Sequence, residues 1–370
     1  MPEPASAPVL VAAGGTGGHL FPAEALAATL NKRGIAVHLV TDRRAARLGG
    51  AFPDQATHIV ASATLRARNP IALTRTAAML GIGLAQAWAL IGRLKPAAVI
   101  GFGGYPTVPP VLAAGWRGVP TLIHDANAVI GRANRLLAPR VSAIATTFPD
   151  VFRDSPRLAA KATLTGNPVR PAVIAVAATP YPAVHDPLRL LVFGGSQGAR
   201  IMAEIVPAAI GRLEPSLRAR LAIVQQAREE DLGRVRCAYE NLAVAAEVAP
   251  FFTDLPARMA ASHLVVARSG ASSVAELSVI GRPALLVPLP HALDQDQFAN
   301  AGVLASAGGA IRLAQEEFTP QRLAAEIAAL AAAPRRLAAM AAAAQSLRRL
   351  DAADRLADLM LEAAGINSKK

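Results

Sequence analysis

Ala13-Gly14-Gly15-Thr16-Gly17-Gly18-His19-Leu20-Phe21-Pro22-Ala23 is a glycine-rich turn between an apolar run and a helix-forming stretch. A second such turn, Phe193-Gly194-Gly195-Ser196-Gln197-Gly198-Ala199-Arg200, lies in the other half of the chain. Glycines let the backbone approach a bulky anion, and the N-terminus of the helix that follows offers free N–H groups to it. The two turns predict two nucleotide-binding-like domains that face one cleft, with a phosphate ester as ligand.

Other glycine-rich signatures fit these turns less well. The dinucleotide fingerprint Gly-x-Gly-x-x-Gly fails, because counted from Gly15 its third glycine falls at Leu20. Asp42 lies after the second apolar run, where a ribose-binding acid would be, so a nicotinamide or flavin enzyme stays open. The second turn lacks the Gly-Lys-Ser/Thr of a P-loop. For either turn alone, a tight turn without a ligand is the simplest alternative.

Short apolar runs alternate with helix-like segments along the whole chain. The runs that we interpret as strands are Val9–Ala12, Val37–Val40, Ala98–Phe102, Thr121–Ile123, Ser142–Ala145, Ala162–Leu164, Leu190–Phe193, Leu221–Val224, Leu264–Ala267 and Ala284–Val287. This alternation predicts an α/β protein with parallel sheets covered by helices. Ligands of such sheets bind outside the carboxyl ends of the strands.

The proline-rich stretch from Gly166 to Pro187 is typical of a connector and predicts the domain boundary. We expect a first domain over residues 1–166 and a second over 167–344. Residues from Gln345 to Leu361 have the pattern of one amphipathic helix. We assign the C-terminal helix, residues 345–365, to the first domain, on which it packs back.

Composition limits the class of protein. The one cysteine, Cys237, excludes a disulfide framework, and we expect it to be buried. The seven histidines show no metal-binding spacing, so we expect neither a metal nor a cofactor. Residues 1–8 lack the basic and apolar regions of a secretory signal, and we expect an intracellular protein.

Charge is spread unevenly over the chain. Residues 1–170 hold 18 Lys and Arg against 7 Asp and Glu, a net of +11, whereas residues 171–370 hold 20 against 19, a net of +1. This asymmetry predicts a polyanionic partner for the first half. Aromatic residues make up only 4% and no nucleic-acid-binding motif occurs, so we expect no nucleic acid. An anionic membrane surface fits better.

Residues 76–92 carry no charge and are flanked by basic side chains. The stretch is marginally short for a membrane span, and we interpret it as a helix that dips into lipid from the surface. A helix of the domain core is the alternative. The predicted membrane contacts are Met79, Ile82 and Trp88, with Arg75, Arg93 and Lys95 at the headgroups.

Further motifs follow the predicted strands. They are Gly101-Phe102-Gly103-Gly104-Tyr105-Pro106, His124-Asp125-Ala126-Asn127, Thr165-Gly166-Asn167-Pro168-Val169-Arg170, Ala267-Arg268-Ser269-Gly270-Ala271-Ser272-Ser273-Val274-Ala275-Glu276 and Asp294-Gln295-Asp296-Gln297-Phe298-Ala299-Asn300-Ala301. In this order and spacing, from about Val9 to the terminal helix, the chain resembles the MurG family of bacterial N-acetylglucosaminyltransferases.

The resemblance implies a fold and an activity. The fold is the glycosyltransferase B-type pair of Rossmann-like domains. The activity is inverting transfer of GlcNAc from UDP-GlcNAc to the MurNAc C4 hydroxyl of undecaprenyl-diphosphate-MurNAc-pentapeptide, which converts lipid I to lipid II. The family works peripherally at the cytoplasmic face of the inner membrane, in the cell-wall synthesis that cell shape and division require. Another lipid-acceptor glycosyltransferase of this fold and a non-catalytic binding protein are the remaining alternatives.

The resemblance also implies roles for residues. Glu276 matches the acid that holds the ribose hydroxyls, and Phe252 the residue whose backbone binds uracil. The other positions implied for donor binding are Thr16, Gly17, Gly18, Asn127, Arg170, Ser196, Ala271, Ser272, Ser273, Gln297 and Asn300. Thr16, His19 and Tyr105 match the acceptor pocket.

An inverting transfer needs a base for the acceptor hydroxyl, and His19 is the first candidate because a histidine titrates near neutral pH. Asp125 is the second candidate, or an orienting partner of His19. The family usually has Glu at this position, so the shorter Asp125 side chain departs from its pattern. An N-cap is the structural alternative for Asp125. Arg170 and helix N-termini would stabilise the leaving diphosphate.

Overall fold

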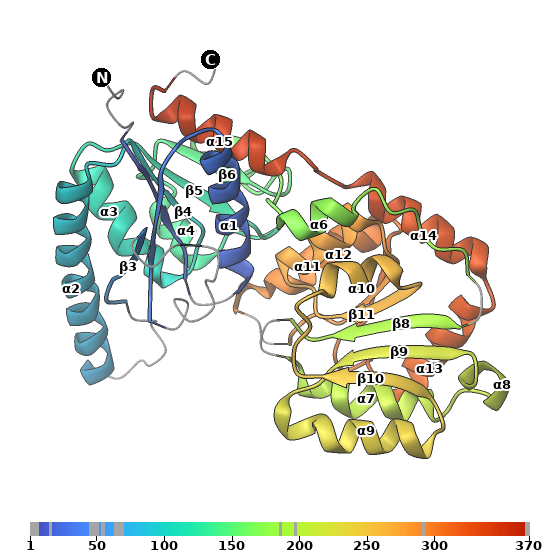
Figure 1. Ribbon diagram of the computed structural model, residues 1–370. Helices are drawn as coiled ribbons and strands as arrows, with labels where there is room; N and C mark the ends of the chain where they lie inside the picture. The colour runs from blue at the N-terminus through green and yellow to red at the C-terminus, as the bar shows by residue number, and fades with distance from the viewer. Residues whose placement is uncertain are drawn as a thin grey trace. The chain divides into compact units, whose positions relative to one another are not determined.

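The computed structural model describes residues 7–14, 17–43, 52, 56–62, 70–184, 187–195, 198–290 and 293–366. The chain forms two compact units, the first made of Met1–Arg170 with Leu350–Lys370 and the second of Pro171–Arg349. Figure 1 shows both as α/β units.

The first unit is built on a sheet in which seven described strands are all parallel, in the order β3-β2-β1-β4-β5-β6-β7. The strands are β1 (Val9–Ala12), β2 (Val37–Thr41), β3 (Thr57–Ile59), β4 (Ala98–Gly101), β5 (Thr121–Asp125), β6 (Ala143–Thr146) and β7 (Ala162–Leu164). The central strands β1, β4 and β5 are buried at every position because helices cover both faces of the sheet. The strand order reverses between β1 and β4, and this switch point is where sheets of this type bind ligands.

Helices enclose this first sheet. They are α1 (Gly17–Lys32), α2 (Pro70–Leu94), η3 (Tyr105–Thr107), α3 (Val108–Trp116), α4 (Arg132–Leu137), α5 (Pro156–Ala159) and α15 (Ala352–Ala363). The last helix, α15, lies alongside α1 and buries Leu356 and Met360 in the same core as Leu26 and Leu30 of α1 (Figure 1). At the outer end of this contact, Arg33 forms ion pairs with Asp354 and Asp358.

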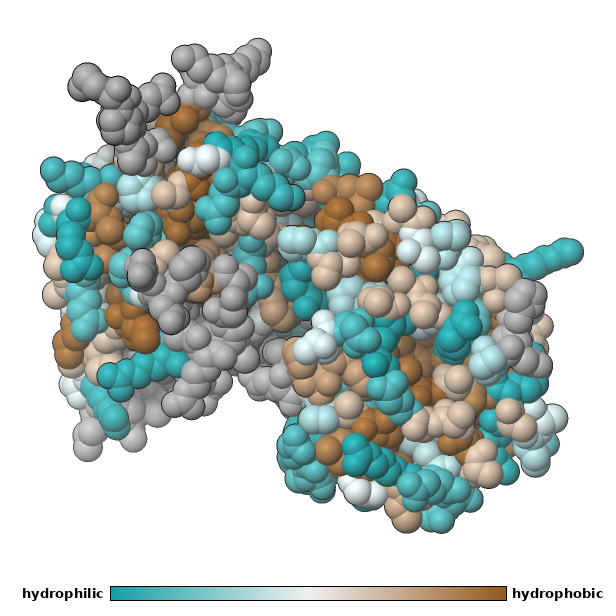
Figure 2. All heavy atoms as spheres, in the orientation of Figure 1, coloured by the Kyte–Doolittle hydropathy of each residue, from teal (hydrophilic) through white to brown (hydrophobic). Residues whose placement is uncertain are grey.

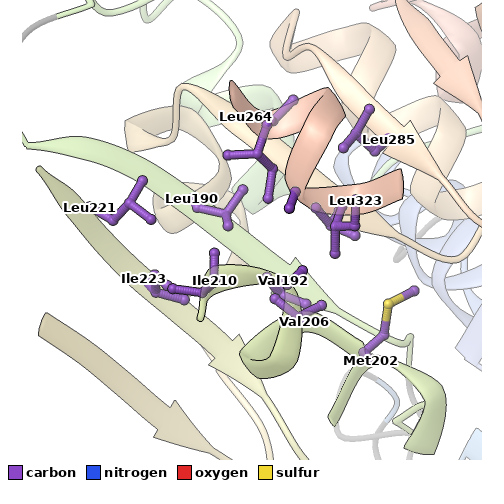
Figure 3. Packing of buried hydrophobic residues seen from close by; sticks show 14 of the residues in the cluster. Leu190, Val192, Met202, Val206, Ile210, Leu221, Ile223, Leu264, Leu285 and Leu323 are labelled. Carbon is purple, nitrogen blue, oxygen red and sulfur yellow. The ribbon is translucent and has the colours of Figure 1, made fainter. Parts of the chain in front are cut away.

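The second unit repeats the plan with a parallel sheet in the order β10-β9-β8-β11-β12-β13. Its strands are β8 (Leu188–Phe193), β9 (Leu221–Gln226), β10 (Ala245–Ala249), β11 (Leu264–Ala267), β12 (Ala284–Leu286) and β13 (Ala310–Arg312). The order reverses between β8 and β11. Leu190, Leu264 and Leu285 of the sheet pack against Val206 and Leu323 of the covering helices (Figure 3).

The helices of the second unit alternate with its strands. They are α6 (Pro171–Val176), α7 (Arg200–Ile210), α8 (Pro215–Arg218), η4 (Glu229–Asp231), α9 (Leu232–Asn241), α10 (Leu255–Ala261), α11 (Ala271–Ile280), η5 (Leu293–Gln295), α12 (Asp296–Ser306), α13 (Pro320–Ala331) and α14 (Pro334–Ser346). Together, the two units confirm the predicted α/β class with parallel sheets and a C-terminal helix on the first unit.

Two expectations are wrong. The single helix predicted from Gln345 to Leu361 is interrupted, because α14 ends at Ser346 and α15 starts at Ala352. The two parts bury their apolar faces in different units: Ala344 of α14 packs against Gly309 in the second unit, and α15 packs on α1 in the first. Cys237 is exposed rather than buried, since it lies on the outer side of α9.

Candidate functional site

The turns after β1 and β4 meet at the switch point of the first unit. A Cβ added at Gly14 would lie 2.7 Å from Pro106 Cγ, so only glycine allows the two turns to approach this closely. Gly17 and Gly18 begin α1. Tyr105 begins η3 and is half-buried. The structure therefore brings Gly17, His19 and Tyr105 to one end of the first sheet, as predicted.

His19 packs directly on the glycines that follow β4. A Cβ at Gly103 would lie 3.0 Å from His19 Cε1, and one at Gly104 would lie 3.4 Å from His19 Cδ2. Both glycines have a positive φ, 95° and 76°, which L side chains rarely adopt. The glycines that follow β4 thus form the surface against which the His19 ring packs.

Burial shapes the electrostatics of His19. It lowers the pKa of His19 below its ordinary value, and a backbone hydrogen bond with Phe102 offsets part of this effect. His19 Nδ1 is buried and has no hydrogen-bond partner among the described residues. The ring is therefore neutral at physiological pH, which is the state that a proton acceptor needs.

His124, near the end of β5, is also neutral. Burial is the main reason that the pKa of His124 is lowered to about 4; the hydrogen bond with Gly166 opposes this shift, and the neighbouring His19 adds a smaller contribution to it. His124 Nε2 lies 3.1 Å from Gly166 O, so the neutral ring donates to this carbonyl. Asn134 Nδ2 donates to His124 O at 3.0 Å, which ties β5 to α4.

Asp125 organises the loop after β5. Its Oδ1 accepts a hydrogen bond from Asn127 N at 3.1 Å, and its Oδ2 accepts from Gly131 N at 3.0 Å and Asn134 Nδ2 at 3.1 Å. The carboxylate is 1% exposed. These bonds engage both oxygens in holding the loop that carries Asn127, which favours a positioning role over proton acceptance from a substrate.

Arg170 ends the first unit, at the close of the Gly166–Arg170 motif. Its guanidinium lies over the ring of Phe21 of α1, 4.3 Å from the ring centroid. Because Phe21 lies about one turn after the start of α1, the structure places the Arg170 side chain at the N-terminal part of that helix. Two predicted positions, Thr16 and Ser196, lie outside the described residues.

In the second unit, α11 starts directly after β11, next to the switch point. Ala271, Ser272 and Ser273 form its first turn, where backbone N–H groups point out of the helix N-terminus. Glu276 lies on the same helix and is buried, so it is not a solvated helix acid. An anion-binding helix end and a buried carboxylate about a turn away can bind a phosphate ester and the hydroxyls beside it.

The loop before α11 is joined to α12. Ser269 Oγ donates to Gln297 O at 2.8 Å, and Asn300 Nδ2 donates to Ser269 O at 3.3 Å. Gln297 Oε1 accepts from Leu289 N, which fixes the loop after β12. Asn300 is fully buried. Gln297 and Asn300 of α12 therefore both contact the loop before α11. Asn300 does so from the buried side of this loop.

One outer surface of the first unit is apolar. Over Thr74–Leu94 of α2 the mean hydropathy is 1.4, only 22% of this stretch is buried, and by length and composition it could span a membrane. Ile82 and Trp88 are exposed, and Arg117 lies over the Trp88 ring at 4.1 Å. Trp116, at the end of α3, is 62% exposed. In Figure 2 the edge formed by α2 mixes brown and tan with teal.

Comparisons with known proteins decide the family. Sequence models of the glycosyltransferase family 28 N-terminal and C-terminal domains match residues 9–146 and 189–356. A relative from Rhodopseudomonas palustris (strain BisB18) is 63% identical over 363 residues, 98% of this chain and 97% of the relative. A relative from Nitrobacter winogradskyi is 62% identical over 358 residues, 96% and 97% of the two chains. The crystal structure of Acinetobacter baumannii MurG aligns with a TM-score of 0.76 at 29% identity, over 96% of this chain and 99% of that one.

The chain belongs to the MurG family of glycosyltransferase family 28. Both relatives carry the name UDP-N-acetylglucosamine–N-acetylmuramyl-(pentapeptide) pyrophosphoryl-undecaprenol N-acetylglucosamine transferase. A UDP-GlcNAc 2-epimerase from Neisseria meningitidis aligns with a TM-score of 0.67 at 13% identity, which shows a shared fold alone. The glycosyltransferase B-type fold that the sequence predicts is thus confirmed.

The structure of this MurG family member adds a role for Gln226, to which the sequence assigned none. Gln226, at the end of β9, accepts from Gly194 N at 3.1 Å and donates to Pro250 O at 3.1 Å, so it joins the loops after β8 and β10. Phe252 follows Pro250 and is buried under Arg258, whose guanidinium lies 4.4 Å from the ring centroid. A polar residue that ends a buried strand is the signal that could have predicted Gln226.

Proposed function

We propose that this chain transfers GlcNAc from UDP-GlcNAc to the MurNAc C4 hydroxyl of undecaprenyl-diphosphate-MurNAc-pentapeptide, with inversion at the anomeric carbon. The observation that carries the proposal is the 63% identity, over 98% of this chain, to a relative named for this transfer. The geometry agrees, because glycine turns and helix N-termini follow the switch-point strands in both units.

The second unit binds the donor in this proposal. The N–H groups of Ala271, Ser272 and Ser273 at the start of α11 hold the diphosphate. Glu276 accepts hydrogen bonds from the ribose hydroxyls. The backbone of Phe252 binds uracil.

Gln297 contacts the donor sugar. Asn300 does not contact the sugar but supports Gln297 indirectly. The support runs through Ser269, which accepts from Asn300 at its carbonyl and donates from its hydroxyl to Gln297 O. In the first unit, the residues with proposed donor roles are Gly17, Gly18 and Asn127, and Tyr105 lines the acceptor pocket.

His19 is the general base. It takes the proton of the acceptor C4 hydroxyl as this oxygen attacks the anomeric carbon. The new carbon–oxygen bond forms while the bond to the diphosphate oxygen breaks, and the electron pair leaves with UDP. Arg170 and the helix N-termini stabilise the charge that develops on UDP. Asp125 positions Asn127 rather than accepting the proton, since both its oxygens hold the loop.

The exposed face of α2 docks on the anionic cytoplasmic surface of the inner membrane. Ile82, Trp88 and the half-buried Met79 enter the lipid, while Arg75, Arg93 and Lys95 meet the headgroups. Trp116 extends the apolar surface from α3, and the arginine stacked on Trp88 adds a further cation beside it. Apolar insertion and charge together give a peripheral, reversible attachment.

The experiment that tests this function uses the whole chain, UDP-GlcNAc and a short-chain polyprenyl-diphosphate MurNAc-pentapeptide. We expect an acceptor product one N-acetylhexosamine heavier by mass spectrometry, with one UDP released per product. Diacylglycerol in place of the muramoyl acceptor should give no product. Transfer to diacylglycerol alone would instead establish a different lipid glycosyltransferase.

A further inference from the structure

A carboxylate of α1 lies beside Arg170 and belongs to none of the motifs. Glu24 is three residues after Phe21, so the two side chains lie on the same face of α1. Arg170 stacks on Phe21 at 4.3 Å and also acts on Glu24 through its charge. All three side chains are half-buried. Phe21 thus offers the Arg170 guanidinium a flat ring, and Glu24, about one helical turn further along α1, offers it a negative charge.

We propose that Glu24 is a positioning residue, which together with the Phe21 ring holds the Arg170 guanidinium in one orientation. A stacked aromatic ring restricts the plane of the guanidinium but leaves it free to rotate within that plane. A carboxylate on the same helix face attracts the guanidinium from one side, and so favours one rotation of the guanidinium within that plane. This inference rests on the proposed function, in which Arg170 stabilises the leaving diphosphate.

The surroundings of Glu24 favour an interaction with Arg170. Burial raises the pKa of Glu24 to about 6, and the positive charge of Arg170 opposes this rise. At pH 7.5 the side chain is therefore mostly ionised, although part of its hydration is lost. Helix α15 also packs on α1, but its acids Asp354 and Asp358 form ion pairs with Arg33, which follows the C-terminal end of α1. Among the described residues, Arg170 supplies the charge that acts on Glu24.

A double-mutant cycle on the whole chain separates positioning from a merely structural role. We expect Glu24→Gln to lower kcat about fivefold, the scale of one partly exposed charge pair, with little change in KM for UDP-GlcNAc. Glu24→Asp should recover part of the loss. In an Arg170→Ala background, Glu24→Gln should change kcat less than about twofold, because the group through which it acts is gone. An equal loss in both backgrounds would overturn the proposal.

Asp358→Asn is the matched control, because it removes a carboxylate that pairs with an arginine at the opposite end of α1. We expect kcat and KM of this variant to equal those of the parent. If the parent chain itself transfers no GlcNAc, the proposed function fails, and turnover can no longer report on Glu24.

A titration tests the pair without turnover. The carboxyl carbon of Glu24, assigned by NMR against Glu24→Gln, should titrate near pH 6 in the parent. In Arg170→Ala its pKa should be higher, because the favourable charge is lost. An unchanged pKa would show that the two groups do not interact and would overturn the proposal, whatever the activity of the enzyme.

Discussion

His19 lies so close to Gly103 that a single methyl group at position 103 would stand 3.0 Å from His19 Cε1. Since a Cβ contact under 3.4 Å is unusually tight, the ring would have to move. The orientation of the proposed base is therefore set by a glycine that is distant in sequence and follows a different strand.

Gly103→Ala should slow the chemical step. The substitution displaces His19 by a few tenths of an ångström, and we expect kcat to fall by about 3- to 10-fold, less than for a catalytic group moved by a full ångström. Gly34→Ala is the matched control, because Gly34 also has a positive φ, 75°, but a Cβ there would meet nothing within 4 Å. Both variants should lose about 1–2 kcal/mol of stability in thermal unfolding, because an L side chain at a positive φ is strained. Equal kcat values for the two variants would argue against this role of Gly103.

His19→Ala should lower kcat by about 10²–10⁴-fold, the usual contribution of a general base, with UDP-GlcNAc affinity nearly kept. Burial lowers the pKa of His19 below 6.5. The neutral base thus persists as the pH falls to 6.5, and kcat should decline only below that pH. Because Glu24 titrates near pH 6, the profile is repeated in Glu24→Gln. A His19→Ala turnover within a few fold of the parent would transfer the role to another group.

Glu276→Gln should weaken UDP-GlcNAc binding by about 1–3 kcal/mol, the range for a lost hydrogen bond to a charged group. Calorimetry on the folded variant measures this change directly. Glu204→Gln, a change on α7 at a partly exposed ion pair with Arg200, serves as the control and should bind like the parent. Unchanged affinity in Glu276→Gln would remove the residue from the donor site.

Ile82→Ser with Trp88→Ser should release the protein from anionic vesicles, because both side chains are exposed on α2. Binding of the parent should weaken as salt rises above 0.15 M, where the Debye length is about 8 Å. Leu136→Ser, which removes an exposed apolar side chain from α4, should keep vesicle binding. UDP affinity should be the same in all three proteins. Unfolding of the first unit in the double variant would instead assign α2 to the core.

Most strands that the sequence predicts lie buried in the middle of a sheet, and the edge strand β7 is the exception. Apolar runs such as Val9–Ala12 and Leu264–Ala267 match β1 and β11 at both ends. The three strands without a predicted run, β3, β10 and β13, lie at sheet edges. An edge strand is half solvated, so its sequence needs no continuous apolar run, and β10 accordingly exposes Glu247.

The place of a candidate residue in the fold was predictable where its motif follows a strand, as for His19 and Glu276. Contacts between distant segments were not, because a sequence pattern does not state which loops meet. The stacking of Arg170 on Phe21 and the packing of His19 against Gly103 both join segments more than 80 residues apart. Asp125 shows the same limit: its spacing allowed either a base or an N-cap, whereas the N-cap of α4 is Gly131 and the three hydrogen bonds that Asp125 accepts hold the loop before this helix.

The central claim is a single displacement of UDP by the acceptor hydroxyl, and the anomeric configuration of the product tests it most directly. The donor sugar is α-linked in UDP-GlcNAc, so one displacement must give a β-linked disaccharide on the polyprenyl diphosphate. We predict this β linkage in the NMR spectrum of the isolated product. An α-linked product, or release of UDP with free GlcNAc and an unchanged acceptor, would contradict the account.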